Sequence, residues 1–415
     1  MSIFIAMFFA TLINILMKKL SFIITGLLIT TSFCCLSCSN SSNSKNISGS
    51  GKIKKQKNLS KAEAEQAIAY HLSIRKETLK KENQEAWSQK EIKVGNLKMK
   101  FLLKEFGKAP QGGHSLYISM HGGGGTETSV NDQQWENQIK LYKPKEGIYI
   151  APRAPIDAWN MWHVAIIDTL MDKLIECCEV FKDINPNKVY IMGYSAGGDG
   201  CYQLAPRLAE RWAAAAMMAG HPGNAKAENL RNVPFSLWVG ELDKAYHRNT
   251  LVPKWNDKLN LLQKNDSLGY IHDAHVVKGD AHWMNHKDTI AIPWMAKYTR
   301  NPYPKRIVWI QDDVLRTTRY WVELPKEELK KGETVIVSYN KQTINIDKCF
   351  TSKITFWLSD EMFDLDKPIK ILYKDNILFE GKVSRNQQDI KNRIDHFYNT
   401  GEKYSAKIEV NVVNS

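Results

Sequence analysis

The serine at position 195 stands in a sequence pattern that proteins use to make a hydroxyl group reactive. Residues 193–197 read Gly-Tyr-Ser-Ala-Gly, and they follow the apolar run 188–192, which predicts a buried strand. A Gly-x-Ser-x-Gly sequence between a strand and a helix holds its serine in a tight, strained turn, around which only small residues fit. The glycines satisfy the geometry of this turn, and Ser195 is the candidate nucleophile. The pentapeptide alone is a weak signal, and the residues around it strengthen it.

A serine nucleophile needs a base that accepts its hydroxyl proton and a carboxylate that orients the base. Asp243 comes at the end of the predicted strand 234–240, in the sequence Gly-Glu-Leu-Asp. His282 follows the predicted strand 270–278, in the sequence Gly-Asp-Ala-His. Both residues therefore lie at the carboxyl ends of predicted strands, where sites on open α/β sheets assemble. Glu241 is the alternative carboxylate, and His286 is the nearest alternative base.

Backbone N–H groups must stabilise the negative oxygen that forms when a serine attacks a carbonyl group. The N–H of Ala196, directly after the serine, is one candidate donor. Gly122 and Gly123 are the others, in the run His-Gly-Gly-Gly-Gly that follows the predicted strand 115–120. Successive glycines let the backbone approach a substrate with its amide groups pointing inward.

Several aromatic residues lie in the loops that surround these positions. Such residues can line an acyl or sugar pocket, or they can pack in the core or at the rim. The candidates for the pocket are His121, Trp159, Trp162 and Trp283. Asn131, Asp132, Asp199 and His221 also lie near the predicted site, without a specific role.

Taken together, these motifs resemble the α/β-hydrolase superfamily. The likeness covers about residues 90 to 300, and it is to the esterase and polyhydroxyalkanoate-depolymerase-like members of the superfamily. It is carried by His-Gly-Gly-Gly at 121–124, Gly-Tyr-Ser-Ala-Gly-Gly at 193–198, Gly-x-x-Asp at 240–243 and Gly-x-x-His at 279–282. More narrowly, residues 119–125, 219–222 and 301–304 are similar to secreted bacterial hydrolases that carry a C-terminal β domain.

The resemblance implies a serine hydrolase of carboxylic esters, with Ser195 as the nucleophile, His282 as the base and Asp243 as the residue that orients it. It implies neither a metal nor an organic cofactor. It leaves the substrate open. A serine peptidase of the prolyl-oligopeptidase type is one alternative, although such enzymes usually carry a large β-propeller before the hydrolase domain. A non-catalytic lipoprotein that binds a glycan or a partner is another.

The order of predicted elements indicates a mostly parallel sheet with helices on both faces, because strands and helices alternate. This predicted catalytic domain spans residues 60–304 and begins with a helix, for which Ser60 and Glu63 form a capping box. After residue 304, short strands such as 320–324 follow one another, interrupted by one helix at 387–397. They predict a smaller, sandwich-like β domain over residues 305–415.

The N-terminal residues 1–38 have the composition of a secretory signal, with a basic start, an apolar stretch and small residues at the end. They resemble a bacterial lipoprotein signal in which Cys38 becomes lipidated, and translation could begin at Met17. The polar segment 39–59 then predicts a flexible tether. This hypothesis attaches the protein to the cell envelope, in the periplasm or at the outer membrane. An uncleaved membrane anchor is the alternative.

The composition is that of an ordinary globular protein, with 43% hydrophobic and 24% charged residues. The net charge of +13 is scattered along the chain, and no nucleic-acid recognition motif accompanies it. The expected partners are therefore a small or polymeric ester substrate and, through the lipid, a membrane, but no nucleic acid. A disulfide is permitted in the cell envelope, but the spacing of the cysteines after residue 38 gives neither a disulfide framework nor a metal site, so we expect them to be buried as small hydrophobes. They are Cys177, Cys178, Cys201 and Cys349.

Overall fold

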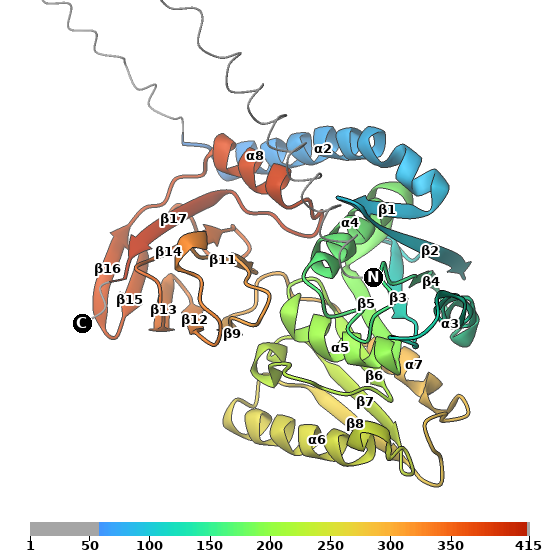
Figure 1. Ribbon diagram of the computed structural model, residues 1–415. Coiled ribbons are helices and arrows are strands. Elements are labelled where there is room, and N and C mark those ends of the chain that lie inside the picture. Colours follow the sequence, from blue (N-terminus) through green and yellow to red (C-terminus); the bar gives the residue numbers. More distant parts are fainter. Residues whose placement is uncertain (1–57, 413–415) are drawn as a thin grey trace, which may run out of the picture. The chain divides into compact units, whose positions relative to one another are not determined.

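Figure 1 shows the computed structural model, which describes residues 58–412. Helix α2 (Lys61–Gln89) begins with the predicted capping box, in which Ser60 Oγ accepts the Glu63 N–H and the Glu63 carboxylate accepts the Ser60 N–H. The predicted signal at 1–38, its Cys38 and nearly all of the tether at 39–59 lie outside the described residues. Within residues 58–412, no helix has both the length and the apolar character that crossing a bilayer requires.

An eight-stranded sheet forms the first part of the fold, in the order β1-β2-β4-β3-β5-β6-β7-β8. The pairs β1–β2 and β2–β4 are antiparallel, and every other pair is parallel. This order is that of the α/β-hydrolase fold, which confirms the predicted fold class. The strands are β1 (Glu91–Val94), β2 (Leu97–Phe106), β3 (His114–Met120), β4 (Gly147–Pro152), β5 (Ile184–Tyr194), β6 (Ala214–Met218), β7 (Phe235–Gly240) and β8 (His272–Val277).

Helices cover both faces of this sheet, because side chains along its central strands alternate between two apolar cores. In β5, Val189 and Ile191 belong to one core, whereas Tyr190 and Met192 belong to the other. The first core is completed by α4 (Ile166–Phe181), α5 (Ala196–Arg207) and α6 (Arg248–Asn265). The second is completed by α3 (Thr128–Leu141) and α7 (Ala291–Met295).

The chain from residue 306 onward forms two further sheets around a core of their own. One sheet has the order β10-β11-β14-β17 and the other β16-β15-β13-β12-β9, and side chains of both meet in one apolar cluster that includes Trp309 and Phe356. The only helix of eight or more residues that is described in this part is α8 (Gln387–His396). The strands are β9 (Arg306–Ile310), β10 (Thr318–Arg319), β11 (Val322–Glu323), β12 (Thr334–Asn340), β13 (Thr343–Lys348), β14 (Lys353–Leu358), β15 (Ile369–Tyr373), β16 (Asn376–Gly381) and β17 (Ala406–Asn411).

The prediction of one strand over residues 320–324 is wrong. Tyr320 and Trp321 form the turn of a short hairpin between β10 and β11, and Tyr320 has a positive φ of 53°. Both aromatic side chains are nevertheless buried, and each anchors the turn with a hydrogen bond: Tyr320 Oη to the Ala209 carbonyl and Trp321 Nε1 to the Pro304 carbonyl. These two residues are apolar because the turn is buried in the tertiary structure. In the sequence, a buried aromatic turn has the same composition as a strand.

The first and last helices of the described chain pack on each other (Figure 1). Ile68 of α2 shares a small apolar cluster with Val180 of α4 and with Ile390 and Ile394 of α8. The N-terminal helix therefore contacts both the eight-stranded sheet's helical layer and the C-terminal part. The four cysteines after residue 38 are buried, as predicted, and their thiols are free.

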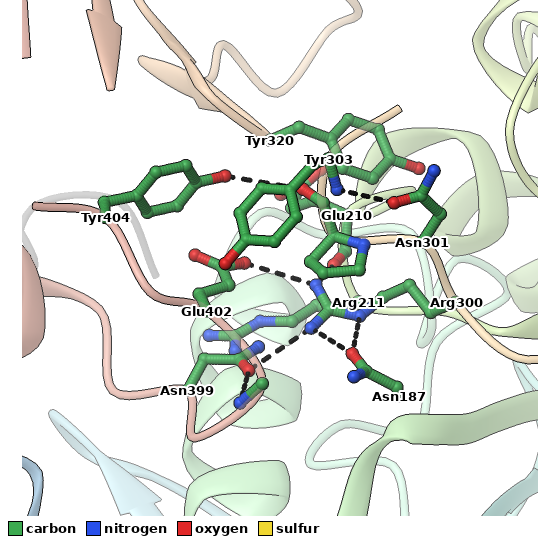
Figure 2. Close-up of polar contacts among 12 residues, drawn as sticks. Asn187, Glu210, Arg211, Arg300, Asn301, Tyr303, Tyr320, Asn399, Glu402 and Tyr404 are labelled. Atoms are coloured by element: carbon green, nitrogen blue, oxygen red, sulfur yellow. Dashed lines mark hydrogen bonds and ion pairs between the residues drawn. The ribbon is translucent and has the colours of Figure 1, made fainter. Parts of the chain in front are cut away.

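A buried polar network joins the two parts of the fold, as Figure 2 shows. Arg300, which follows α7, donates to Glu402 at 3.2 Å and to the side chain of Asn187 in β5 at 2.8 Å. Arg393 of α8 donates to the second carboxylate oxygen of Glu402 at 2.9 Å. Because Arg300, Arg393 and Glu402 are all at most 6% exposed, each charge depends on its protein partners for the hydrogen bonds that water would otherwise supply.

A second ionic cluster also joins the two parts of the fold. Arg316 and Arg319 of the C-terminal part reach into the helical layer of the large sheet. Arg316 pairs with Asp168 of α4 at 3.5 Å and with Glu210 at 3.1 Å, and Arg319 pairs with Glu210 at 3.4 Å. The loop that precedes β10 is therefore held against α4 and the end of α5.

Candidate active site

Ser195 occupies a strained turn between β5 and α5, as the Gly-x-Ser-x-Gly pattern predicts. Its backbone has φ 57° and ψ −120°, a conformation that residues other than glycine rarely adopt. A Cβ atom on Gly193 would lie 2.1 Å from the Gly197 carbonyl oxygen, and one on Gly197 would lie 2.1 Å from the Met120 carbonyl oxygen. The turn can therefore form only with glycine at both positions. It places the Ser195 side chain just beyond the end of the strand.

His282 and Asp243 lie in a chain of hydrogen bonds that ends at this serine. The distance from Ser195 Oγ to His282 Nε2 is 3.0 Å, and that from His282 Nδ1 to Asp243 Oδ2 is 2.7 Å. Asp243 is buried, whereas the His282 side chain is 42% exposed. With Nδ1–H donating to the carboxylate, Nε2 is free to accept the serine proton. The three residues come from the ends of β5, β7 and β8, as predicted.

The loops that carry Asp243 and His282 touch each other at Gly240. A Cβ atom there would lie 1.9 Å from the Ala281 carbonyl oxygen. Only glycine at position 240 therefore lets the end of β7 come this close to the histidine loop. The Leu242 N–H also donates to the Asp280 carbonyl at 2.8 Å. The glycine before the acid thus serves the close approach of two loops.

Tyr194 holds the histidine loop from the side of the nucleophile, a role that the sequence did not reveal. Its hydroxyl donates to the His282 carbonyl at 2.7 Å and accepts the Met284 N–H at 3.0 Å. Burial raises the pKa of this phenol, so it remains a donor throughout the neutral range. The variable position of the Gly-x-Ser-x-Gly sequence therefore fixes the base relative to the nucleophile.

The glycine run at 121–125 lies beside Ser195, where an oxyanion would need donors. Gly122 and Gly123 line the same cavity as Ser195, and Gly123 has a φ of 109°. The buried Asn131 of α3 clamps the run, because its side chain accepts the Gly124 N–H and donates to the Gly124 carbonyl, both at 2.9 Å. Ala196 is the first residue of α5, so its N–H has no acceptor within the helix.

His121 does not line a substrate pocket, which corrects the prediction. It is fully buried and holds the glycine run from beneath: Nε2 accepts the Ala154 N–H at 3.0 Å, and Nδ1 contacts the Gly122 carbonyl at 2.6 Å. These bonds assign the ring proton to Nδ1. Burial lowers the pKa of His121 to about 4, so the ring is neutral and the acceptor is kept at neutral pH.

Trp162 does not line a pocket either. The side chain is fully buried, with its ring edge-on to His121, and its Nε1 donates to the His121 carbonyl at 3.0 Å. A Cβ atom on Gly200 of α5 would lie 2.5 Å from the Trp162 Cβ, so the indole sits directly against the helix. The loop around Trp162 is rich in aromatic residues, and its sequence does not indicate that this side chain points inward.

Two cavities meet at Ser195 and His282. The smaller has a volume of about 530 Å³ and extends along α3 between Val130, Leu141, Tyr194 and Trp283. The larger has a volume of about 1240 Å³ and extends toward Trp159, Asp199, Gln203 and Arg248, with Asp313 and Val314 of the C-terminal part in its wall. Trp283 therefore lines the smaller cavity and Trp159 the larger one, and their contact with a substrate stays a prediction.

The remaining residues near the site have definite positions. Asp132 pairs with Arg153 at 2.8 Å, and Asp199 accepts the His221 N–H at 2.6 Å. Glu241, the alternative acid, accepts the Gly279 N–H at 2.9 Å and does not contact His282. His286, the alternative base, lies edge-on to the Trp283 ring. Among residues 58–412, no group of three or more metal-binding side chains is arranged to hold an ion.

Comparisons with known proteins add a context for this fold. No protein-family profile and no curated protein matches the sequence. Among solved structures, a thermostable esterase is similar at 18% identity with a TM-score of 0.38, over 51% of this chain and 62% of its own, so the match spans less than two thirds of that esterase. The BES protein from Bacillus cereus is similar at 12% identity with a TM-score of 0.38, over 50% of this chain and 92% of its own.

A feruloyl esterase module from Clostridium thermocellum, solved with sinapinate, is similar at 14% identity and a TM-score of 0.35. That match covers 49% of this chain and 83% of the module. Identities and scores at this level carry no conclusion about activity. The fold assignment therefore stands on the strand order and helix arrangement described above.

Proposed function

We propose that this protein is a serine hydrolase that cleaves carboxylic esters through an acyl-enzyme on Ser195. The single observation that supports this most strongly is the hydrogen-bonded chain from Ser195 through His282 to the buried Asp243, at 3.0 and 2.7 Å. A nucleophile, its base and the acid that orients the base lie at the strand ends where the glycine run supplies oxyanion donors.

In the first half of the proposed reaction, Ser195 Oγ attacks the ester carbonyl while His282 Nε2 takes the hydroxyl proton. The N–H groups of Ala196 and of Gly122 or Gly123 stabilise the negative oxygen of the intermediate, and the N-terminus of α5 adds its favourable dipole. His282 then gives its proton to the leaving alcohol as the carbon–oxygen bond breaks. Asp243 remains ionised and stabilises the imidazolium ion.

In the second half, a water molecule attacks the acyl-enzyme, with His282 taking a proton from the water and returning it to Ser195 Oγ. The acid is released and the enzyme is restored. No redox change or further reactant is needed, so the residues already described balance the reaction.

Hydrolysis of 4-nitrophenyl acetate tests this proposal when the full-length protein is compared with Ser195→Ala. We expect turnover by the wild type and a fall in kcat/KM of at least about a thousandfold in the variant. A fluorophosphonate probe should label the wild type and not the variant. If neither ester nor probe reacts with the wild type, the non-catalytic binding lipoprotein becomes the better hypothesis, and if only peptide substrates react, the peptidase does.

The location of the protein is a separate proposal, which rests on residues outside the described part. We propose that Cys38 becomes lipidated after export and attaches the protein to the cell envelope. Metabolic labelling with an alkynyl fatty acid should then tag the wild type but not Cys38→Ser. Labelling of both proteins, or of neither, contradicts the proposal.

A further inference from the structure

Arg248 stands at a place in the chain where an arginine opposes helix stability. It is the first residue of α6, and the first turn of this helix contains no acidic residue. The N-terminus of a helix carries a partial positive charge, which disfavours a cation there. Arg248 is also only 7% exposed, so its charge has lost most of its hydrating water. Neither the helix nor hydration accounts for an arginine at this position, and a carboxylate partner is needed to offset its cost.

That partner is Asp243, the residue that orients the base. Arg248 Nη1 lies 3.9 Å from Asp243 Oδ1, whereas Asp243 Oδ2 bonds to His282 Nδ1 at 2.7 Å. The two oxygens of the buried carboxylate therefore face different partners. Among residues 58–412, Asp243 provides the only carboxylate within 4 Å of the Arg248 side-chain nitrogens. This distance is too long for a direct hydrogen bond, so Arg248 acts on Asp243 through its charge.

The chain around Arg248 keeps the guanidinium in this position. The Asn249 N–H donates to the Asp243 carbonyl at 3.0 Å, and the Asn249 side chain donates to the Glu241 carbonyl at 2.9 Å. These bonds fasten the start of α6 to the loop that carries Asp243. The exposed Tyr246 ring lies against the guanidinium, with its centroid 4.8 Å from Arg248 Cζ. Such a ring attracts the cation and keeps water from it, which strengthens the effect of its charge on Asp243.

Two further titratable groups face Arg248 from other elements. Burial raises the pKa of Asp199 of α5 to about 6, and Arg248 and His282 favour its ionised form, so Asp199 is charged at neutral pH. His221 lies in the loop after β6. Burial lowers its pKa, and the positive charges of Arg248 and His247 lower it further, so this imidazole is neutral there.

The remaining charged groups around His282 are compensated or neutral. Asp280 of the histidine loop pairs with Lys287 at 2.9 Å. Burial raises the pKa of the Tyr194 phenol, which is therefore uncharged. Arg248 is thus the cation that the described chain places against the hydrogen-bonded pair of Asp243 and His282.

A cation in this position has two effects on the pair. It stabilises the ionised form of Asp243, and it disfavours a second positive charge on His282. We propose that Arg248 is a positioning residue of the Ser195 site, which holds the Asp243 carboxylate toward His282 and lets His282 remain a free base at lower pH. The inference rests on the proposed serine-hydrolase function.

The test is the pH profile of kcat/KM for hydrolysis of 4-nitrophenyl acetate by the full-length protein. The acid limb of this profile reports protonation of the base in the free enzyme. Arg248→Met removes the charge and keeps a long side chain, so the limb should move up by about one pH unit. The plateau should fall by about tenfold, because the carboxylate is held less well. Arg248→Lys keeps the charge and should return the limb to within about 0.3 pH units of the wild type.

Two control variants show that the charge and its place decide the shift. Lys244→Met removes an exposed cation directly after Asp243, and because water screens this charge the limb should stay within about 0.2 pH units. Asp199→Asn removes a negative charge near His282 but keeps an acceptor for the His221 N–H. It should therefore move the limb in the opposite direction, to lower pH.

If Arg248→Met fails to fold, Tyr246→Ala serves as the test, because its ring is 72% exposed and contributes little to stability. Without the ring, water reaches the guanidinium and weakens its effect. The limb should then move up by about 0.3–0.5 pH units. Tyr246→Phe keeps the ring and should leave the limb in place.

The outcomes separate this inference from the function on which it rests. A limb that moves up in Arg248→Met and returns in Arg248→Lys supports the positioning role. A lower plateau with an unmoved limb in Arg248→Met means that the residue only stabilises its loop, which overturns the proposal, as does an equal shift in Lys244→Met. Both results leave the serine hydrolase standing. A wild type that neither hydrolyses the ester nor reacts with the fluorophosphonate probe overturns both.

Discussion

Two polar clusters in this protein, the Ser195 site and the Arg300–Glu402 junction, differ in how their groups are paired. At the junction, Arg300 and Glu402 are at most 6% exposed, and Arg300 bonds to several acceptors at once. At the site, Ser195 is strained and the His282 side chain is 42% exposed. Burial and multiple bonds fix one arrangement of the chain at the junction, whereas strain and exposure at the site leave reactive groups open to another molecule.

The comparison predicts that substitutions at the site change activity more than stability, and that those at the junction do the reverse.

Asp243→Asn should lower kcat for nitrophenyl acetate by about 10⁴-fold, or about 5.5 kcal/mol of transition-state stabilisation. The amide cannot hold His282 in the tautomer whose Nε2 accepts the serine proton. Glu241→Gln is the matched control, since the Glu241 side chain accepts the Gly279 N–H, and the variant should keep kcat within about threefold. A large loss in Glu241→Gln with little in Asp243→Asn would transfer the role to Glu241.

Glu402→Gln should lower the free energy of unfolding by about 3–5 kcal/mol, because it leaves the guanidinium groups of Arg300 and Arg393 buried without a full counter-charge. Chemical denaturation measures the loss. Glu361→Gln provides the comparison, since Glu361 and Lys403 form an exposed pair at 3.9 Å that should contribute less than about 1 kcal/mol. Equal effects of the two substitutions would mean that the junction is not specially stabilising.

Acidification should weaken the support beneath the glycine run. His121 has a pKa of about 4 in the fold against an ordinary value of 6.5, so the unfolded chain takes up the proton first as the pH falls. The stabilisation is fully present above pH 6.5 and is lost as the pH falls toward 4, by about 3 kcal/mol. Denaturation midpoints between pH 7 and pH 4 should fall more steeply in the wild type than in His121→Gln. Parallel curves would contradict this.

Ser195→Gly should raise the free energy of unfolding by about 1 kcal/mol, because glycine adopts the backbone conformation of the turn without strain. Ser195→Ala keeps a Cβ atom in the same turn and should not share the gain, although both variants lose the nucleophile. Thermal unfolding of the two inactive variants measures the difference. If alanine stabilises as much as glycine, the strain does not lie in the Ser195 backbone.

Much of the sheet region was predictable because its signals are local. A buried parallel strand reads as a continuous apolar run, and a glycine-flanked serine, a Gly-x-x-Asp and a Gly-x-x-His each follow such a run. The hairpin at Tyr320 was missed for the same reason, since buried aromatic residues in a turn have the composition of a strand. The roles of Tyr194 and Asn131 were also missed. Tyr194 contacts His282 and Met284, which lie 88 and 90 residues further along the chain. Asn131 contacts Gly124 nearby in sequence, but only the path of the loop before α3 brings its side chain onto the glycine run.

The sequence by itself determined the fold class and the three residues that the hydrogen-bonded chain brings together, because backbone sterics and strand-end geometry require particular residue types in a fixed order. Only the tertiary structure decided which aromatic residues face a cavity: Trp162 is buried under α5, whereas Trp159 is exposed at the rim. Only it brought Asp313 and Asp199 to the same cavity. Side-chain direction and pairing across distant segments depend on packing, which no local pattern records.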